Sequence, residues 1–209
     1  MAEQILKPGL PGEWPEKRKQ KARAGTSGIY FVNLFKAMFE QLGEDTYPII
    51  EETMRRNANT ESLLGLVMRV MFEKLGEGAY PIIEEMMARN AERFFLPGLK
   101  GFGIEGKDPL AIATYFYLAD CEVLGQPGEV FVEEGGRRAG FRLYKPCALF
   151  PTDKDLEETP PEVCHAFSNF ERTAAKLAGQ EWGIKMKTYF TKLLTKGDDY
   201  CEEVFEIEE

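Results

Sequence analysis

Apolar residues recur at helical spacing through the first 125 residues of the chain. One stripe lies within residues 31–42 and another within residues 63–71, both in steps of three and four. Asp108-Pro109 has the pattern of a helix N-cap followed by a proline in the first turn. It therefore predicts a further helix over residues 110–125.

After Gly125 the apolar period changes from 3.6 to 2, which is typical of strands. The segments EVFVEE and AGFRLYKPCALF flank a Gly-Gly turn and predict a hairpin. Thr159-Pro160-Pro161 predicts the start of another helix, ending at Gly179. The segments IKMKTYFTKLLT and YCEEVFEIEE predict two last strands. This order predicts an α+β fold, in which an N-terminal helical layer packs on a mainly antiparallel sheet of about four strands.

An internal repeat is the clearest signal in the sequence. Residues 38–58 (MFEQLGEDTYPIIEETMRRNA) recur as residues 71–91 (MFEKLGEGAYPIIEEMMARNA), with 16 of 21 positions identical. Each copy predicts a helix that ends at Leu-Gly and a second helix that starts near Tyr-Pro. We interpret the repeat as a tandem duplication of one helical hairpin. The extra copy would extend the helical layer or exchange between the subunits of a homodimer.

The length of 209 residues predicts one domain with one core. Residues 1–27 contain three prolines and a basic run and are predicted to be a flexible N-terminal arm. Residues 28–98 would be the helical region with the duplicated hairpin. Residues 99–209 would be the α+β part of the same domain, which binds the ligand or carries the catalysis.

Composition narrows the class of protein and its partners. Asp and Glu outnumber Lys and Arg by 35 to 26, so the net charge of -9 predicts no nucleic-acid partner. The sequence has no apolar run long enough for a membrane span and no recognisable signal peptide, and this predicts a cytoplasmic protein without a membrane partner. Four cysteines without a Cys-x-x-Cys pair favour reduced thiols.

The cysteines are candidates for chemistry because the predicted elements place all four at one helix–sheet interface. They could be small buried apolar residues. Cys147, Cys164 and Cys201 could instead join a histidine at a zinc site. A single activated thiolate is the third possibility, and its best candidates are Cys164, in the first turn of a helix, and Cys201, beside a turn.

His165 is the only histidine of the chain, so any catalysis that needs one must use it. It shares a helix side with Asn169, and it could be a general base, a metal ligand or an ordinary surface residue. Asp120 and Glu171 lie near apolar stripes, where either could bind a cationic or amidine group.

Residues 94–109 are rich in glycine and proline and are predicted to form a loop. The segment GFGIEG within it matches a dinucleotide-binding pattern, but no strand precedes it. A nucleotide site is therefore not predicted there.

Residues 65–209 resemble a known family. The strings KDPLAIATYFYLADCEVLG, KPCALF, PPEVC and IKMKTYFTKLLTKGDDYCEEVFEI are similar to the family named for L-2-amino-thiazoline-4-carboxylic acid hydrolase. The family's cysteines would fall on Cys147, Cys164 and Cys201. The fold is also similar to the 4-vinyl-reductase and Golgi-transport-particle domains, which hold hydrophobic ligands.

The resemblance implies a hydrolase acting on a C=N bond of a small cyclic amidine or thiazoline carboxylate. Cys164 or Cys201 would attack the ring or hold a metal, such as zinc, that activates water, and His165 would move protons. Candidate substrate-binding residues are Asp120, Glu171, Asn169 and Tyr117. Two alternatives stay open, namely a non-enzymatic binding or sensor domain whose aromatic helices enclose a small molecule, and a helical assembly module built on the duplicated hairpin.

Overall fold

The structure is a computed structural model that describes residues 3–10, 14–56, 63–133 and 135–208. Its strands are β1 (Glu3–Leu6), β2 (Gly128–Glu133), β3 (Arg138–Tyr144), β4 (Met186–Lys192) and β5 (Tyr200–Ile207). Its α-helices are α1 (Glu16–Leu42), α2 (Tyr47–Arg56), α3 (Leu63–Leu75), α4 (Ala79–Gly101), α5 (Pro109–Tyr117), α6 (Asp153–Glu158), α7 (Pro161–Phe167) and α8 (Asn169–Trp182). A π-helical turn, Leu118–Val123, continues α5.

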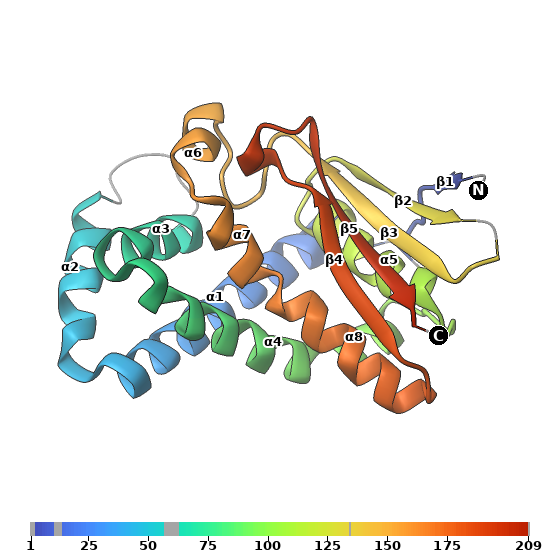
Figure 1. Ribbon diagram of the computed structural model, residues 1–209, viewed down its shortest axis with the longest axis horizontal. Coiled ribbons are helices and arrows are strands. Elements are labelled where there is room, and N and C mark those ends of the chain that lie inside the picture. Colours follow the sequence, from blue (N-terminus) through green and yellow to red (C-terminus); the bar gives the residue numbers. More distant parts are fainter. Residues whose placement is uncertain (1–2, 11–13, 57–62, 134, 209) are drawn as a thin grey trace.

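The five strands form one antiparallel sheet in the order β1-β2-β3-β5-β4. Helix α5 packs against β2, β3 and β5, and α8 packs against β4. Helices α1 and α4 run from the sheet toward α2 and α3, which lie at the opposite end of the molecule (Figure 1). The predicted α+β fold and antiparallel sheet are confirmed, with one strand more than expected.

The additional strand lies in the stretch that we predicted to be a flexible arm. Residues Glu3–Leu6 pair with β2, and α1 already begins at Glu16. Arg142 of β3 reaches Glu3 with a distance of 2.8 Å between Nη2 and Oε2. A pattern of four residues is too short to predict a strand. The strand that pairs with it also lies more than 100 residues away in the sequence. The structure therefore differs from the expected arm.

Two helical boundaries also differ from the prediction. The expected loop over residues 94–109 is wrong in its first half, because α4 continues to Gly101 with Pro97 inside it. Phe95 and Leu99 are buried on either side of this proline, and their packing offsets the one helical hydrogen bond that it removes. The helix predicted to end at Gly179 is two helices, α7 and α8, which divide at Ser168 and end at Trp182.

The two repeat copies have the predicted hairpin form. Each first helix ends at a glycine with positive φ, 57° at Gly43 and 54° at Gly76. A short 3-10 turn follows, and then the second helix begins. Asp108 also caps α5 as predicted, since its side chain accepts a hydrogen bond of 2.9 Å from the Ala111 amide.

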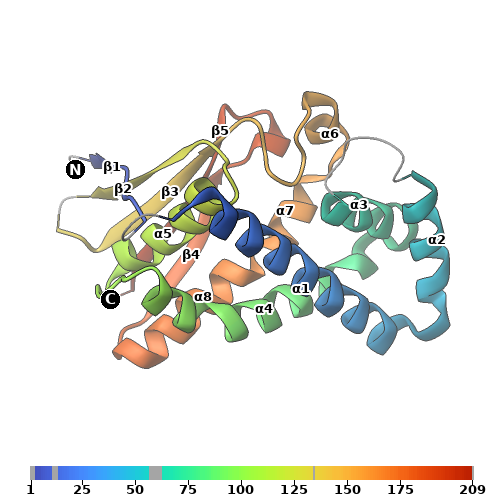
Figure 2. The same cartoon turned by 180° about the vertical axis from the view of Figure 1, so that it is seen from behind.

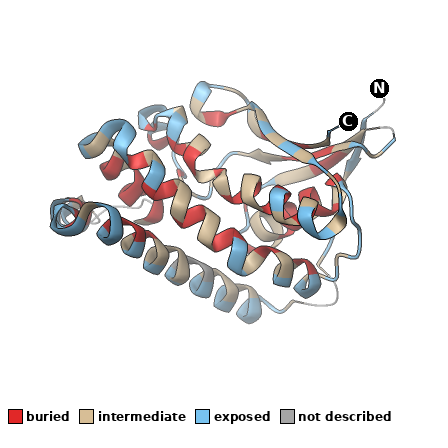
Figure 3. Cartoon of the chain, turned by 60° about the horizontal axis from the view of Figure 1, so that its bottom comes forward, coloured by how far each residue is buried: buried red, intermediate tan, exposed pale blue. Residues whose placement is uncertain are grey.

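The two copies pack against each other within this chain, α1 against α4 and α2 against α3. Their ion pairs are reciprocal: Arg56 of the first copy binds Glu73 of the second, and the equivalent Arg89 binds Glu40 of the first. Figure 2 shows α1 alongside α4 and α2 at the end of the molecule farthest from the sheet. Buried residues gather where the helices face one another, and exposed residues lie on the outward turns (Figure 3).

Candidate functional site

Three carboxyl groups and two tyrosines converge where the helices meet the sheet. Tyr30 comes from α1, Tyr115 from α5, Asp120 from the π-helical turn, Glu171 from α8 and Glu203 from β5. Their charges act on one another: Asp120 raises the pKa of Glu171, and both raise the pKa of Glu203, Tyr30 and Tyr115. We call these five residues the acidic cluster.

Local structure explains why polar groups point into this interior. In β5, Cys201, Glu203 and Phe205 alternate with residues of the opposite face, so Glu203 stands on the same face as the core residue Phe205. Asp120 lies in the π-helical turn, a feature that is frequent at functional sites in proteins. The Asp120 carbonyl accepts a hydrogen bond of 2.9 Å from the Gln126 amide, which ties the end of this turn.

The cluster runs from a partly exposed edge to a buried interior. Asp120 and Tyr30 keep partial exposure, whereas Glu171 is 9% exposed and Glu203 is 2% exposed. Glu203 accepts a hydrogen bond of 3.2 Å from the Thr188 hydroxyl. The Oε2 atom of Glu171 is buried and has no hydrogen-bond partner among the described residues. A buried oxygen without a donor is costly, and this one needs an explanation.

Burial favours the neutral form of these acids. It raises the pKa of Asp120 to about 7. Burial, and then the charge of Asp120, raises the pKa of Glu171 to about 8. The pKa of Glu203 is also raised well above its usual value, first by burial and then by the charge of Glu171. The cluster therefore holds protons near neutral pH that a cation could displace.

Aromatic rings pack around the two tyrosines of the acidic cluster. The Tyr30 ring lies 6.4 Å from the Phe170 ring, and the Tyr115 ring lies 6.5 Å from it on another side. Phe95 and Phe102 contact Tyr115 at ring distances of 5.1 and 5.6 Å. Aromatic faces beside carboxylates are a suitable environment for an organic cation.

Of the four cysteines, Cys147, Cys164 and Cys201 lie near one another, since their charges are mutually coupled. Cys121 lies beside Gly128 of β2, and the charge of Asp120 raises the pKa of both Cys121 and Cys147, so that all four line one interface stays a prediction. Burial raises the pKa of Cys201 to about 12 and raises that of Cys164 further. Both thiols stay protonated at neutral pH, which is unlike an activated nucleophile.

The remaining predicted site residues lie apart from the acidic cluster. His165 contacts Lys196, with 3.4 Å between Nε2 and Nζ, and packs edge-on against the Phe190 ring. Burial and the Lys196 charge lower the pKa of His165. Asn169 donates a hydrogen bond of 2.6 Å to the Glu84 carbonyl. Tyr117 is buried, and the nearby charges of Cys121 and Glu122 raise its pKa further after burial.

Metal binding was one of the predicted roles of the cysteines. Over the described ranges, no group of three or more His, Cys, Asp or Glu side chains is placed to hold a metal ion. None of the described helices combines the length and the apolar character that crossing a bilayer requires.

The structure thus brings together Asp120 and Glu171, two of the residues predicted from the sequence, and adds three that sequence reasoning missed. Glu203 could have been found, because a period of two places it on the face of Cys201 and Phe205. Tyr30 had no signal of its own, whereas Tyr115 belongs to the aromatic helices that the binding-domain alternative invokes.

Comparisons with known proteins give a fold but no family. No protein-family model matches the chain, and no curated protein is detectably similar in sequence. An Fe(II) unliganded H-NOX protein from K. algicida has a TM-score of 0.54 at 8% identity, covering 87% of this chain and 96% of its own. An H-NOX domain from Shewanella oneidensis in the Fe(II)CO state has a TM-score of 0.53 at 13% identity, covering 87% and 98%.

A trafficking protein particle complex subunit 3 from Naegleria fowleri, covalently bound to palmitic acid, has a TM-score of 0.48 at 17% identity, covering 70% of this chain and 94% of its own. The H-NOX structures carry the fold assignment. The chain therefore shares its α+β fold with H-NOX domains.

Proposed function

We propose that this chain is a small-molecule-binding or sensor domain whose ligand is a small organic cation. The shared fold supports this proposal, because the H-NOX structures are described by their ligation states. The observation that carries it is the buried Oε2 of Glu171, which has no donor among the described residues. A ligand with N–H groups would supply that donor, and the aromatic rings would face its charge.

The cationic class follows from the charges of the cluster. Asp120, Glu171 and Glu203 together would carry three negative charges, and Arg172 is the basic residue that lowers the pKa of both glutamates. An anionic ligand would be repelled by this charge, and a neutral ligand would leave the acids protonated. An amine, amidine or guanidinium would replace the protons that the acids hold at neutral pH.

Heme is a ligand of the H-NOX family, and the residues of this chain do not fit it. Proteins bind heme iron through His, Cys thiolate, Met or Tyr. The single histidine is occupied by Lys196 and Phe190, and burial keeps the clustered thiols and the two tyrosines of the acidic cluster protonated. Between α5 and the sheet, the Phe116 ring packs on Phe205 at 5.8 Å. We therefore propose no heme for this protein.

Hydrolysis of a cyclic amidine or thiazoline carboxylate, which the family resemblance implies, stays a prediction. Its nucleophile would be Cys164 or Cys201, and burial opposes ionisation of both. Binding of a cation uses Asp120 and Glu171 as they lie and needs no thiolate. Incubation with 2-amino-thiazoline-4-carboxylate, followed by measurement of substrate consumption, tests the hydrolase directly.

Calorimetric titration with benzamidine and with its neutral analogue benzamide tests the cation site. We expect benzamidine to bind at least tenfold more tightly, and we expect its binding at pH 7 to release protons, seen as a binding enthalpy that depends on the buffer. Glu171→Gln should weaken benzamidine binding at least tenfold, whereas Glu181→Gln, an exposed position on the same helix, should leave it unchanged. Equal binding of the two compounds, or no effect of Glu171→Gln, would contradict the proposal.

A further inference from the structure

The two repeat copies have equivalent outer faces, related by an offset of 33 residues along the chain. On the second copy and the turn of α3 just before it, this face carries Arg69, Phe72, Tyr80, Glu84 and Met87. In the first copy the same positions hold Lys36, Phe39, Tyr47, Glu51 and Met54. Two aromatic residues, a methionine, one acid and one basic residue are therefore kept in both.

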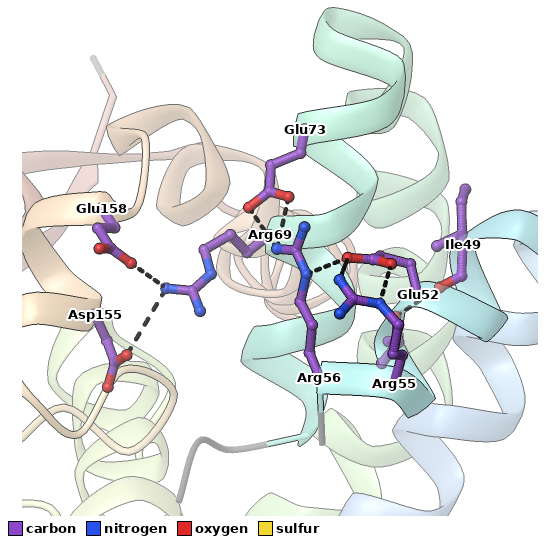
Figure 4. A network of polar contacts seen from close by, with 9 residues as sticks. Ile49, Glu52, Arg55, Arg56, Arg69, Glu73, Asp155 and Glu158 are labelled. Atoms are coloured by element: carbon purple, nitrogen blue, oxygen red, sulfur yellow. Dashed lines mark hydrogen bonds and ion pairs between the residues drawn. The ribbon is translucent and has the colours of Figure 1, made fainter. Parts of the chain in front are cut away.

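The outer face of the second copy is covered by residues 153–172 of the same chain. Arg69 pairs with Asp155 and Glu158 of α6, at 3.7 and 3.2 Å (Figure 4). At the other end, Glu84 pairs with Arg172 of α8 at 2.8 Å. A basic and an acidic group thus hold the two ends of the covering segment.

Between these ion pairs lie the aromatic residues of the second copy. Phe72 and Tyr80 meet edge to face at 5.2 Å and line a groove of about 330 Å³ together with Pro160 and Glu162. Helices α7 and α8 lie against α4, and Met87 is only 1% exposed. The covering segment therefore supplies acids, a proline, an apolar helix and an arginine, in that order.

No segment among the described residues covers the outer face of the first copy. Phe39 and Tyr47 meet edge to face at 5.6 Å, as their equivalents do, but they are 42% and 60% exposed. Met54 is 64% exposed. Lys36 makes a 3.9 Å contact with Glu40 on its own helix, and Glu51 is exposed. The same pattern of apolar and charged groups thus faces solvent.

We propose that this face binds a helical segment of a partner protein with the chemistry of residues 153–172. Acidic side chains of that segment pair with Lys36, a proline and apolar residues cover Phe39, Tyr47 and Met54, and an arginine pairs with Glu51. Burying these three large side chains supplies the main driving force, and the two charges fix the direction of the bound helix.

One position limits where the partner lies. Gly65 of α3 is approached by the Leu149 carbonyl so closely that an added Cβ would overlap it. The first copy has Val32 at this place, and Val32 is 66% exposed. The partner segment therefore makes its first contact at Lys36. It has no residues equivalent to those that precede α6 in this chain.

The test uses the full-length protein and a fluorescent peptide of residues 153–172 with Cys164→Ser. In the intact chain the second copy is already covered, so the peptide reports on the first copy. We expect saturable binding in a fluorescence anisotropy titration. Met54→Glu and Lys36→Glu should each weaken it at least tenfold, and Lys107→Glu, an exposed charge reversal in a distant loop, should not.

A charge exchange makes the test specific for the proposed direction. A peptide with Asp155→Lys and Glu158→Lys should bind the Lys36→Glu protein more tightly than it binds the unaltered protein. Absence of saturable binding, or equal binding by the Met54→Glu protein, overturns the proposal. Sedimentation that shows a concentration-dependent dimer, dissociated by Met54→Glu, would overturn the partner helix in favour of a second copy of this chain.

Discussion

Replacement of Glu171 by glutamine tests the central feature of the candidate site. The folded-state pKa of about 8 lies above the ordinary value of 4.5, because burial and the Asp120 charge oppose ionisation. The folded protein therefore keeps a proton that the unfolded chain has already lost. The free energy of unfolding must fall as pH rises from 4.5 to about 8, and the loss is complete above that range.

The magnitude follows from the two pKa values. One pKa unit corresponds to about 1.36 kcal/mol, so the raised pKa of Glu171 lowers the free energy of unfolding by on the order of 1 kcal/mol at pH 5.5 and by on the order of 4 to 5 kcal/mol at pH 8.5. The difference of roughly 3 kcal/mol should disappear in Glu171→Gln, which carries a neutral amide of the same size. At pH 8.5 we expect the variant to be more stable than the unaltered protein.

Urea unfolding at pH 5.5, 7.0 and 8.5 measures this effect. Asp120 and Glu203 continue to titrate in the variant, so part of the pH dependence should remain. Glu181→Gln on the same helix is the matched control and should keep the full pH dependence. An unfolding free energy that falls equally steeply in Glu171→Gln and in the unaltered protein would refute the burial of an ionisable group at this position.

Three further predictions concern packing, thiols and the sheet edge. Gly65→Ala should lower the free energy of unfolding by about 1–3 kcal/mol, because the added Cβ meets a backbone carbonyl. Gly28→Ala, which has open space around it, should be neutral or stabilising. Equal effects of the two substitutions in urea unfolding would contradict this prediction. Cys164 and Cys201 should react with a thiol reagent at pH 8 far more slowly than in the unfolded chain, and one fast thiol in the native protein would revive the nucleophile. Arg142→Gln should cost about 3 kcal/mol and speed amide exchange in β1, and unchanged exchange there would show that its ion pairs do not hold this strand.

Local signals in the sequence predicted most of the fold. Gly43 and Gly76 marked the helix ends of the two copies, and Asp108 with Pro109 marked the start of α5, because each of these residues acts on the backbone within a few residues of itself. The strand β1 and the second half of α4 escaped prediction because they depend on contacts with distant residues. A propensity rule sees Pro97 but not the buried side chains around it.

The candidate site was predicted in part, for the same physical reason. Asp120 and Glu171 stood out because each is a charge beside an apolar stripe. Their convergence with Glu203 depends on how the sheet lies against α5 and α8, which no spacing within the sequence encodes. The proximity of three cysteines followed from element faces, whereas their inactivity follows from burial, which became visible only in three dimensions.

The repeat gives this molecule an internal reference for its own dynamics. Tyr47 and Tyr80 have nearly the same neighbours in sequence and the same edge-on ring contact, but Tyr80 borders a groove that Pro160 and Glu162 also line, whereas Tyr47 is 60% exposed. Ring-flip rates and amide exchange at the two sites, recorded in one sample, would differ only through what lies above them. A bound partner would slow the ring flips of Tyr47 toward the rate of Tyr80.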